Sequence, residues 1–435
     1  MKLALQAPPL QHVRSRAAAR ASGPARGQAI HALAPTVVFA ALLFNFILCF
    51  LKTRGLNVGQ VAVIGSEVAI LVIGGLLIFP TASRATVAYF LALVAYVGFL
   101  RYFNFALDLK IGIDLSIPVI FWVLGEKYAD LRGADRIVLA ATIIVVIVGL
   151  FEWFWLDEYQ NYFDIFQYFV DKGSADASRS SVTGTKFFTS AFRPPGEGRE
   201  VLPGLGNHRD SSIFLEPIGA GNFGALVFFW AIHRFSAAPR INAVLIALAL
   251  GIIILADTRL GAILCGIGLV ARAVPLARKP VILFLIPAVM PVLILYVTAL
   301  HTHATIDNGF VGRIYSAGQV LQSWDLLQWM GLEPSPIAAY DAGYGYLISN
   351  FGLLAALLLW AVAVRHRGLV ATGGFGLTTV IYLGLSLCVT GSPLSIKTAA
   401  LLWFLNGVLS RPVDAPAPEV VPVATLSGGV LHGTG

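Results

Sequence analysis

The chain has 435 residues, of which 57% are hydrophobic and only 12% are charged, and its mean hydropathy is +0.79. This composition excludes an ordinary soluble protein and is typical of a chain that crosses a membrane several times. The net charge of +7 does not indicate nucleic-acid binding, because the basic residues are scattered through the termini and the short connections, where membrane topology favours them.

The chain divides into two polar tails and one long apolar region. Residues 1–32 and 410–435 are rich in Pro, Ala, Gly and Val without helical or strand periodicity, so we expect disordered tails. The region between them, residues 33–409, is predicted to form a single transmembrane domain. Its cysteines, Cys49, Cys265 and Cys388, lie in separate apolar runs without metal-binding spacing, so we expect neither a disulfide nor a metal or other cofactor.

The apolar runs predict an all-α fold, a polytopic integral membrane protein with about twelve transmembrane helices. We expect these spans near residues 33–51, 59–79, 85–103, 111–125, 137–156, 213–232, 241–256, 260–275, 281–300, 343–364, 373–391 and 394–409. Lys and Arg gather in every second connection, which predicts that both termini are cytoplasmic.

Two long segments, at residues 157–210 and 301–342, then fall outside the cytoplasm. Each contains an apolar stripe at helical spacing, which predicts an amphipathic helix anchored at the membrane interface. The first stripe comprises Tyr159, Tyr162, Phe163, Phe166 and Phe169; the second comprises Ile314, Ala317, Val320, Leu321, Trp324 and Leu327.

Charged residues within or beside the spans fall mainly in the outer half of the predicted domain. Each one alone is equally well explained as an interfacial residue whose charge reaches water. Their shared side instead indicates a polar funnel that opens outward, because such residues usually face a hydrated cavity. The candidate funnel residues are Glu67, Arg101, Asp114, Glu216, Arg259 and Lys397, with Asp341 and Tyr344 at the start of a later span.

The short cytoplasmic connections leave no room for a nucleotide-binding domain, and the chain contains no phosphate-binding loop or dinucleotide fingerprint. A sugar donor would therefore arrive already activated on a polyprenyl diphosphate. Such a donor needs cations for its diphosphate and a base for the acceptor hydroxyl. Glu216 is our candidate base, with His208 as the alternative. The candidate cations are Arg193, Arg199, Arg209, Arg259, Arg313 and Lys397.

Four motifs carry a resemblance to a known family: SIFLEPIGAGNF, LADTRLGAIL, GRIYSAGQ and YDAGYGYLISNFGLLA. Together with the order of spans and the two long outer segments, they resemble bacterial Wzy-type polysaccharide polymerases, and within these the exopolysaccharide polymerases of the xanthan type. The resemblance extends over residues 33–409. It implies a metal-independent glycosyltransferase of the bacterial inner membrane that joins lipid-linked repeat units, with Arg193, Arg259 and Arg313 engaging diphosphates.

The resemblance leaves the base and the acceptor open. Related O-antigen ligases use a histidine in a later outer loop, but His301 and His303 here have no convincing motif around them. A ligase that hands the same donor to another acceptor is therefore one alternative. A transporter or flippase of lipid-linked sugars is another, although it would predict charge near the midplane and short loops. Expected partners are the lipid-linked oligosaccharide, membrane lipid, and chain-length and export proteins, with no nucleic acid.

Overall fold

The computed structural model describes residues 23–174, 185–193, 199, 201–273, 279–300, 310–336, 342–365 and 368–411 of the chain. Most of both predicted tails, and the candidate residues Asp341, His301 and His303, lie outside these ranges. All regular secondary structure in the described ranges is helical, apart from an isolated antiparallel bridge between Phe192 and His208. The predicted all-α class is therefore confirmed.

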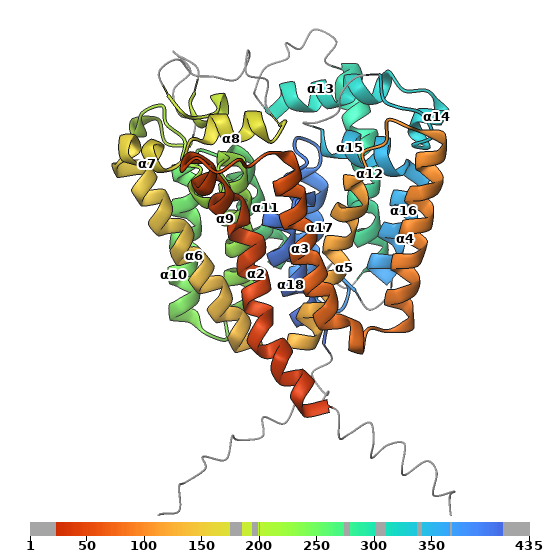
Figure 1. Ribbon diagram of the computed structural model, residues 1–435, viewed down its shortest axis with the longest axis horizontal. Helices are drawn as coiled ribbons and strands as arrows, with labels where there is room; N and C mark the ends of the chain where they lie inside the picture. The colour runs from red at the N-terminus through yellow and green to blue at the C-terminus, as the bar shows by residue number, and fades with distance from the viewer. Residues whose placement is uncertain are drawn as a thin grey trace, which may run out of the picture.

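The helices form a bundle, with α7, α8, α13 and α14 gathered across one end (Figure 1). We call this end of the bundle the loop end. The α-helices are α2 (Gly23–Thr53), α3 (Gln60–Ile78), α4 (Arg84–Phe103), α5 (Lys110–Tyr128), α6 (Leu131–Phe154), α7 (Leu156–Tyr162), α8 (Ile165–Asp171), α9 (Pro217–Arg234), α10 (Pro239–Leu255), α11 (Arg259–Ala273), α12 (Pro280–Leu300), α13 (Phe310–Gln322), α14 (Leu326–Trp329), α15 (Gly343–Phe351), α16 (Leu353–Arg365), α17 (Gly374–Ser386) and α18 (Ile396–Ser410).

Five of the described helices are long and apolar enough to cross a membrane: α2 from Ala32, α3, α4, α6 and α12. The pair α15 and α16 adds a sixth candidate if the two count as one span. A helix occupies each of the other predicted spans, but these helices are short or carry polar and charged residues. The helical membrane architecture is thus supported, while the count of about twelve spans stays a prediction.

The predicted span at residues 343–364 is not one continuous helix. Its two halves, α15 and α16, meet at an angle of 104°. The break falls at Gly352, whose φ of +78° lies in the left-handed region that glycine adopts readily. A Cβ at this position would also lie 2.4 Å from the carbonyl oxygen of Met330, so the residues after α14 pack directly on the bend.

The two helices α5 and α18 approach closely because each has glycine at the crossing. A Cβ on Gly125 would lie 2.0 Å from the carbonyl oxygen of Phe404, and a Cβ on Gly407 would lie 2.0 Å from that of Trp122. Small residues at such positions let two backbones come into contact, which is how helices associate in lipid. This contact fixes α18, and with it Lys397, against the rest of the bundle.

Prolines in α12 release carbonyl groups that side chains from neighbouring helices then satisfy. Pro291 cannot donate to the carbonyl of Pro287, and the hydroxyl of Tyr344 donates to it instead at 3.0 Å. In the same way the Trp360 indole donates to the carbonyl of Leu283 at 3.2 Å, where Pro287 has removed the usual donor. Tyr344 therefore has a packing contact in α15 that explains its presence.

The helices at the loop end differ from the predicted interfacial anchors. The first aromatic stripe is divided between α7 and α8, and Tyr159, Phe163 and Phe169 are buried in the main core. In the second stripe Ala317 and Leu321 are buried against α12 and α15. The buried members of both stripes therefore contact protein, while Tyr162 and Leu327 are exposed. Hydrophobic periodicity marks the buried face of a helix without showing what covers it.

Candidate functional site

Four arginines lie near one another at the loop end, and one of them pairs with a buried aspartate. Asp257 lies between α10 and α11 with a φ of +48° and a fully buried side chain. Its Oδ2 accepts from Nε of Arg193 at 2.7 Å, and its Oδ1 accepts from the backbone N–H of Val201 at 2.8 Å. A non-glycine residue in the left-handed region is strained, and such strain tends to occur at functional or tightly determined positions.

Two further arginines cover the carboxyl end of α10. Arg199 donates to the carbonyls of His208 and Leu255 at 2.9 and 2.6 Å, and also to that of Ile254. Arg209 donates to the carbonyls of Ala256, Ser190 and Asp257 at 3.2, 3.0 and 3.3 Å. The last carbonyls of a helix have no partner within that helix, and the negative end of its dipole favours cations. The fold thus brings two arginines here for a local reason.

The positive charges are close enough to oppose one another. Burial, followed by the charge of Arg193, lowers the pKa of Arg209 from its ordinary 12.5 to about 9, and Arg313 and Arg199 lower it further, while Asp257 raises it. Arg313 belongs to α13 in the second long segment, so both long segments contribute to the site. We call Arg193, Arg199, Arg209 and Arg313 the arginine cluster.

Arg259, the other predicted phosphate ligand, begins α11 two residues after Asp257. Its side chain is exposed. Its place beside the arginine cluster follows from the turn between α10 and α11.

A buried glutamate that the sequence analysis did not select organises the segment beneath the cluster. Glu152, in the last turn of α6, is fully buried and accepts from the backbone N–H groups of Ser211 and Ser212, the latter at 2.7 Å. It also lies 3.1 Å from Nε2 of His208. Burial and the neighbouring Glu152 carboxyl raise the pKa of Asp210 well above its ordinary value. The carboxyl groups of Glu152 and Asp210 are therefore close enough to oppose each other's charge.

His208, the alternative base, is unsuited to that role. Its ring packs among Trp153, Phe187 and Phe192, with ring centroids 5.2 to 6.1 Å away. Burial lowers its pKa to about 4, below the range of an effective base at neutral pH. Its hydrogen bond to Glu152 instead indicates a structural role.

Glu216 lies at the entrance of α9, but differently from the prediction. It precedes the helix as its N-terminal cap residue, and α9 begins at Pro217. The reason is local, because Leu215 adopts a φ of +61° and ends a short 3₁₀ turn at Ser212–Phe214. Its ion-pair partner is Lys397, whose Nζ lies 3.5 Å from Oε1 of Glu216, whereas Arg209 contacts the end of α10.

Lys397 lies where a positive charge is unfavourable, and its ion pair with Glu216 offsets this cost. It lies in the first turn of α18, where the helix dipole disfavours a cation, and its side chain is 7% exposed. Its ammonium also donates to the carbonyl of Phe214 at 3.1 Å. The side chain of Glu216 remains 32% exposed, so one of its faces is open to a ligand.

Other predicted funnel residues form a second polar group near the loop end. Lys110 lies 2.5 Å from Asp114 and 3.9 Å from Glu67, and Tyr346 donates to Asp114 at 3.0 Å. Lys172, which follows α8, has its pKa lowered to about 8 by burial and then by Lys397.

Several funnel candidates come together and others do not. Asp114 and Glu67 are linked through Lys110, and Glu216 is paired with Lys397, while Lys172 is electrostatically coupled to both groups. Arg101 instead donates to carbonyls just beyond its own helix, including that of Leu107 at 3.0 Å. The fold therefore brings four of the funnel candidates into two neighbouring ionic groups.

The fold and these polar groups define a helical membrane protein with a cationic site at one end. A search of the described residues for groups of His, Cys, Asp and Glu that could hold a metal ion finds none. No protein-family model matches the chain, and searches of curated proteins and of solved structures also found no match.

Proposed function

We propose that the protein polymerises polyprenyl-diphosphate-linked oligosaccharide repeat units at the outer face of a bacterial inner membrane. The observation that carries the proposal is the arginine cluster, in which Arg193 pairs with the carboxylate of Asp257 and the charges of Arg193, Arg199 and Arg313 act on Arg209. Their combined positive charge is larger than the single negative charge of Asp257. An anion bound beside the arginines would therefore relieve their mutual repulsion. Guanidinium groups also pair bidentately with phosphate oxygens.

In this proposal the arginine cluster holds the donor diphosphate and Glu216 acts as the base. The acceptor hydroxyl oxygen forms a bond to the anomeric carbon of the donor sugar while its proton passes to Glu216. The bond from that carbon to the diphosphate oxygen breaks, and polyprenyl diphosphate leaves with its charge held by the arginines. The transfer involves only the donor, the acceptor and side chains of this protein.

The two parts of the proposed site belong to one short segment. Arg209 and Glu216 are seven residues apart, so an extended chain would separate them by no more than about 25 Å. Because the base and the diphosphate act at the same anomeric carbon, the proposal requires the two to lie within about one sugar ring of each other when the donor is bound. Lys397 contacts both Glu216 and the carbonyl of Phe214, which fixes the position of the carboxylate within the segment.

The membrane arrangement of the proposal has about twelve spans, both termini in the cytoplasm and the loop end outside. It follows from the distribution of Lys and Arg in the sequence. The donor lipid would then reach the arginine cluster from the outer leaflet. The sugars and the linkage are not specified by these residues.

A reconstituted assay tests the function. Purified full-length protein in lipid vesicles is given a labelled polyprenyl-diphosphate-linked repeat unit, and we expect a ladder of lengthening chains with release of polyprenyl diphosphate. Transfer of single units to a different acceptor without lengthening would indicate a ligase. Movement of units across the membrane without any joining would indicate a flippase. Either result would contradict the proposal.

Arg313 provides a matched test of the phosphate role. Loss of hydrogen bonds between charged groups costs about 1.5 to 3 kcal/mol, so Arg313→Gln should raise the donor KM roughly 10- to 100-fold. The control is Arg84→Gln, which changes an exposed arginine at the start of α4. Equal KM values for the two variants would remove Arg313 from the site.

A further inference from the structure

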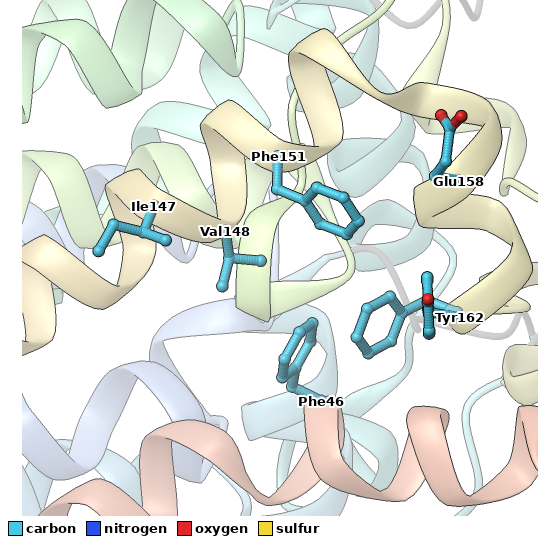
Figure 2. Close-up of a pocket in the computed structure, with 7 residues that line it drawn as sticks. Phe46, Ile147, Val148, Phe151, Glu158 and Tyr162 are labelled. Carbon is cyan, nitrogen blue, oxygen red and sulfur yellow. The ribbon is translucent and has the colours of Figure 1, made fainter.

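A groove outside the proposed active site lies between α2, α6 and α7. It has a volume of about 480 Å³, within the range of roughly 300 to 1,000 Å³ that small-molecule sites occupy. Its walls are apolar, and Figure 2 shows Ile147 toward one end and Glu158 and Tyr162 toward the other. The lining residues are Phe46, Ile147, Val148, Phe151, Glu158, Tyr162 and Phe163.

The groove extends from the loop end down the side of the bundle. Phe46 precedes the end of α2 by seven residues, and Ile147 precedes the end of α6 by the same number. At about 1.5 Å per residue, the apolar walls reach about 10 Å below the helix ends. Ile147 is 61% exposed, so the groove opens sideways on the bundle rather than into its core. This shape suits a hydrocarbon chain entering from lipid.

The polar end of the groove carries one cation and one anion. The guanidinium of Arg54 lies 4.9 Å from the ring centroid of Tyr162 and 5.2 Å from that of Phe50, which places it over the aromatic rim. Glu158 lies one helical turn before Tyr162 on α7 and is exposed. The neighbouring Lys52 pairs with Asp171, so Arg54 is the cation stacked on this rim.

We propose that this groove binds an aminophospholipid, with one acyl chain between the apolar walls, the phosphate on Arg54 and the ammonium on Glu158. A headgroup with both charges matches the paired charges of the rim. The phosphate of an anionic headgroup, or a diphosphate, could also pair with Arg54, but such a headgroup has no cation for Glu158. The inference concerns a face of α6 away from Glu152 and does not depend on the proposed polymerase activity.

Native mass spectrometry of the purified full-length protein tests the inference, with phosphatidylethanolamine, phosphatidylglycerol and polyprenyl diphosphate added in turn. The wild-type protein should retain phosphatidylethanolamine about tenfold more strongly than phosphatidylglycerol, as expected for the one charge-assisted contact, from the ammonium to Glu158, that only phosphatidylethanolamine makes. Glu158→Gln should abolish this preference. Arg54→Gln should weaken retention of both phospholipids, and Val148→Trp should fill the groove and remove bound lipid.

The control is Glu126→Gln, which changes an exposed glutamate on α5 outside the groove and should keep the preference. Equal retention of the two phospholipids by the wild-type protein would overturn the proposal. So would an unchanged preference in Glu158→Gln, or displacement of phosphatidylethanolamine by an equal concentration of polyprenyl diphosphate. Because Glu158 is on the surface, its variant gives a decisive answer even if Val148→Trp does not fold.

Discussion

Replacement of Glu152 by alanine should destabilise the protein strongly. The side chain is fully buried and is the acceptor for the backbone N–H groups of Ser211 and Ser212. Each buried donor left without a partner costs about 1 to 3 kcal/mol, so two such donors give a loss of about 2 to 6 kcal/mol. The lost contact to His208 adds to this, because that ring then has a buried nitrogen without its partner.

Glu152→Gln should cost less than the alanine variant. The glutamine keeps an acceptor oxygen for the backbone groups, and its amide offers a donor toward the buried Oδ1 of Asp210, which has no hydrogen-bond partner. The loss of one negative charge also removes the repulsion between the two acids. Stability should therefore decrease in the order wild type, Glu152→Gln, Glu152→Ala. This order distinguishes loss of the hydrogen-bond network from a simple loss of side-chain volume.

Thermal unfolding of the purified protein in detergent measures the effect, with Glu126→Ala as the control for an exposed glutamate. We expect the midpoint of Glu152→Ala to fall by several degrees and that of the control to stay near wild type, since surface substitutions usually change stability by less than about 0.5 kcal/mol. Equal midpoints for the two variants would refute the role given to Glu152.

Three further predictions concern the histidine, the orientation and metal ions. The fold lowers the pKa of His208 from 6.5 to about 4, so the folded protein binds fewer protons there than the unfolded chain. The stability contributed by neutral His208 is complete above pH 6.5 and is lost as the pH falls toward 4. In thermal melts His208→Asn should therefore lose less stability on acidification than the wild-type protein, while its activity at neutral pH persists. Leu326→Cys, on the exposed surface of α14, should react with an impermeant maleimide from outside, whereas Leu131→Cys at the start of α6 should react only after permeabilisation; the reverse would overturn the orientation. The native cysteines are buried and should give little background. Activity should survive EDTA, because the proposed cations are arginines, and loss on chelation with recovery on adding magnesium would refute this.

Hydropathy located the helices well, because apolar runs and helix ends are local properties of the chain. It could not show the bend at Gly352, which depends on a left-handed glycine and on the backbone of Met330 beside it. It also could not tell whether the stripe with Tyr159 faces lipid or protein. That side chain is buried and donates to the carbonyl of Ser212 at 3.1 Å, a contact between residues 53 positions apart.

Arginines selected from the sequence as candidate cations lie close together in the fold, but their partners could not be predicted. Arg193, Arg209 and Arg313 were selected as outer cations, and the first two are indeed near Asp257. The spacing of residues in the sequence could not show that Arg199 and Arg209 donate to carbonyl groups at the end of α10. Glu152 was missed because a single acid at the end of an apolar helix reads as an interfacial residue. Its position in a span, among the four aromatic residues of the run FEWFW, was the available signal.

The central claim is that Glu216 accepts the proton of the acceptor hydroxyl at a site where the arginine cluster holds the donor. Single-turnover chain extension by Glu216→Gln in lipid vesicles, with donor binding measured on the same preparation, tests this most directly. The variant keeps the size of the side chain but loses its basicity. We predict unchanged donor binding and a rate lowered by about a hundred- to ten-thousand-fold. Extension at a near wild-type rate would contradict the claim and leave Glu216 as the ion-pair partner of Lys397 alone.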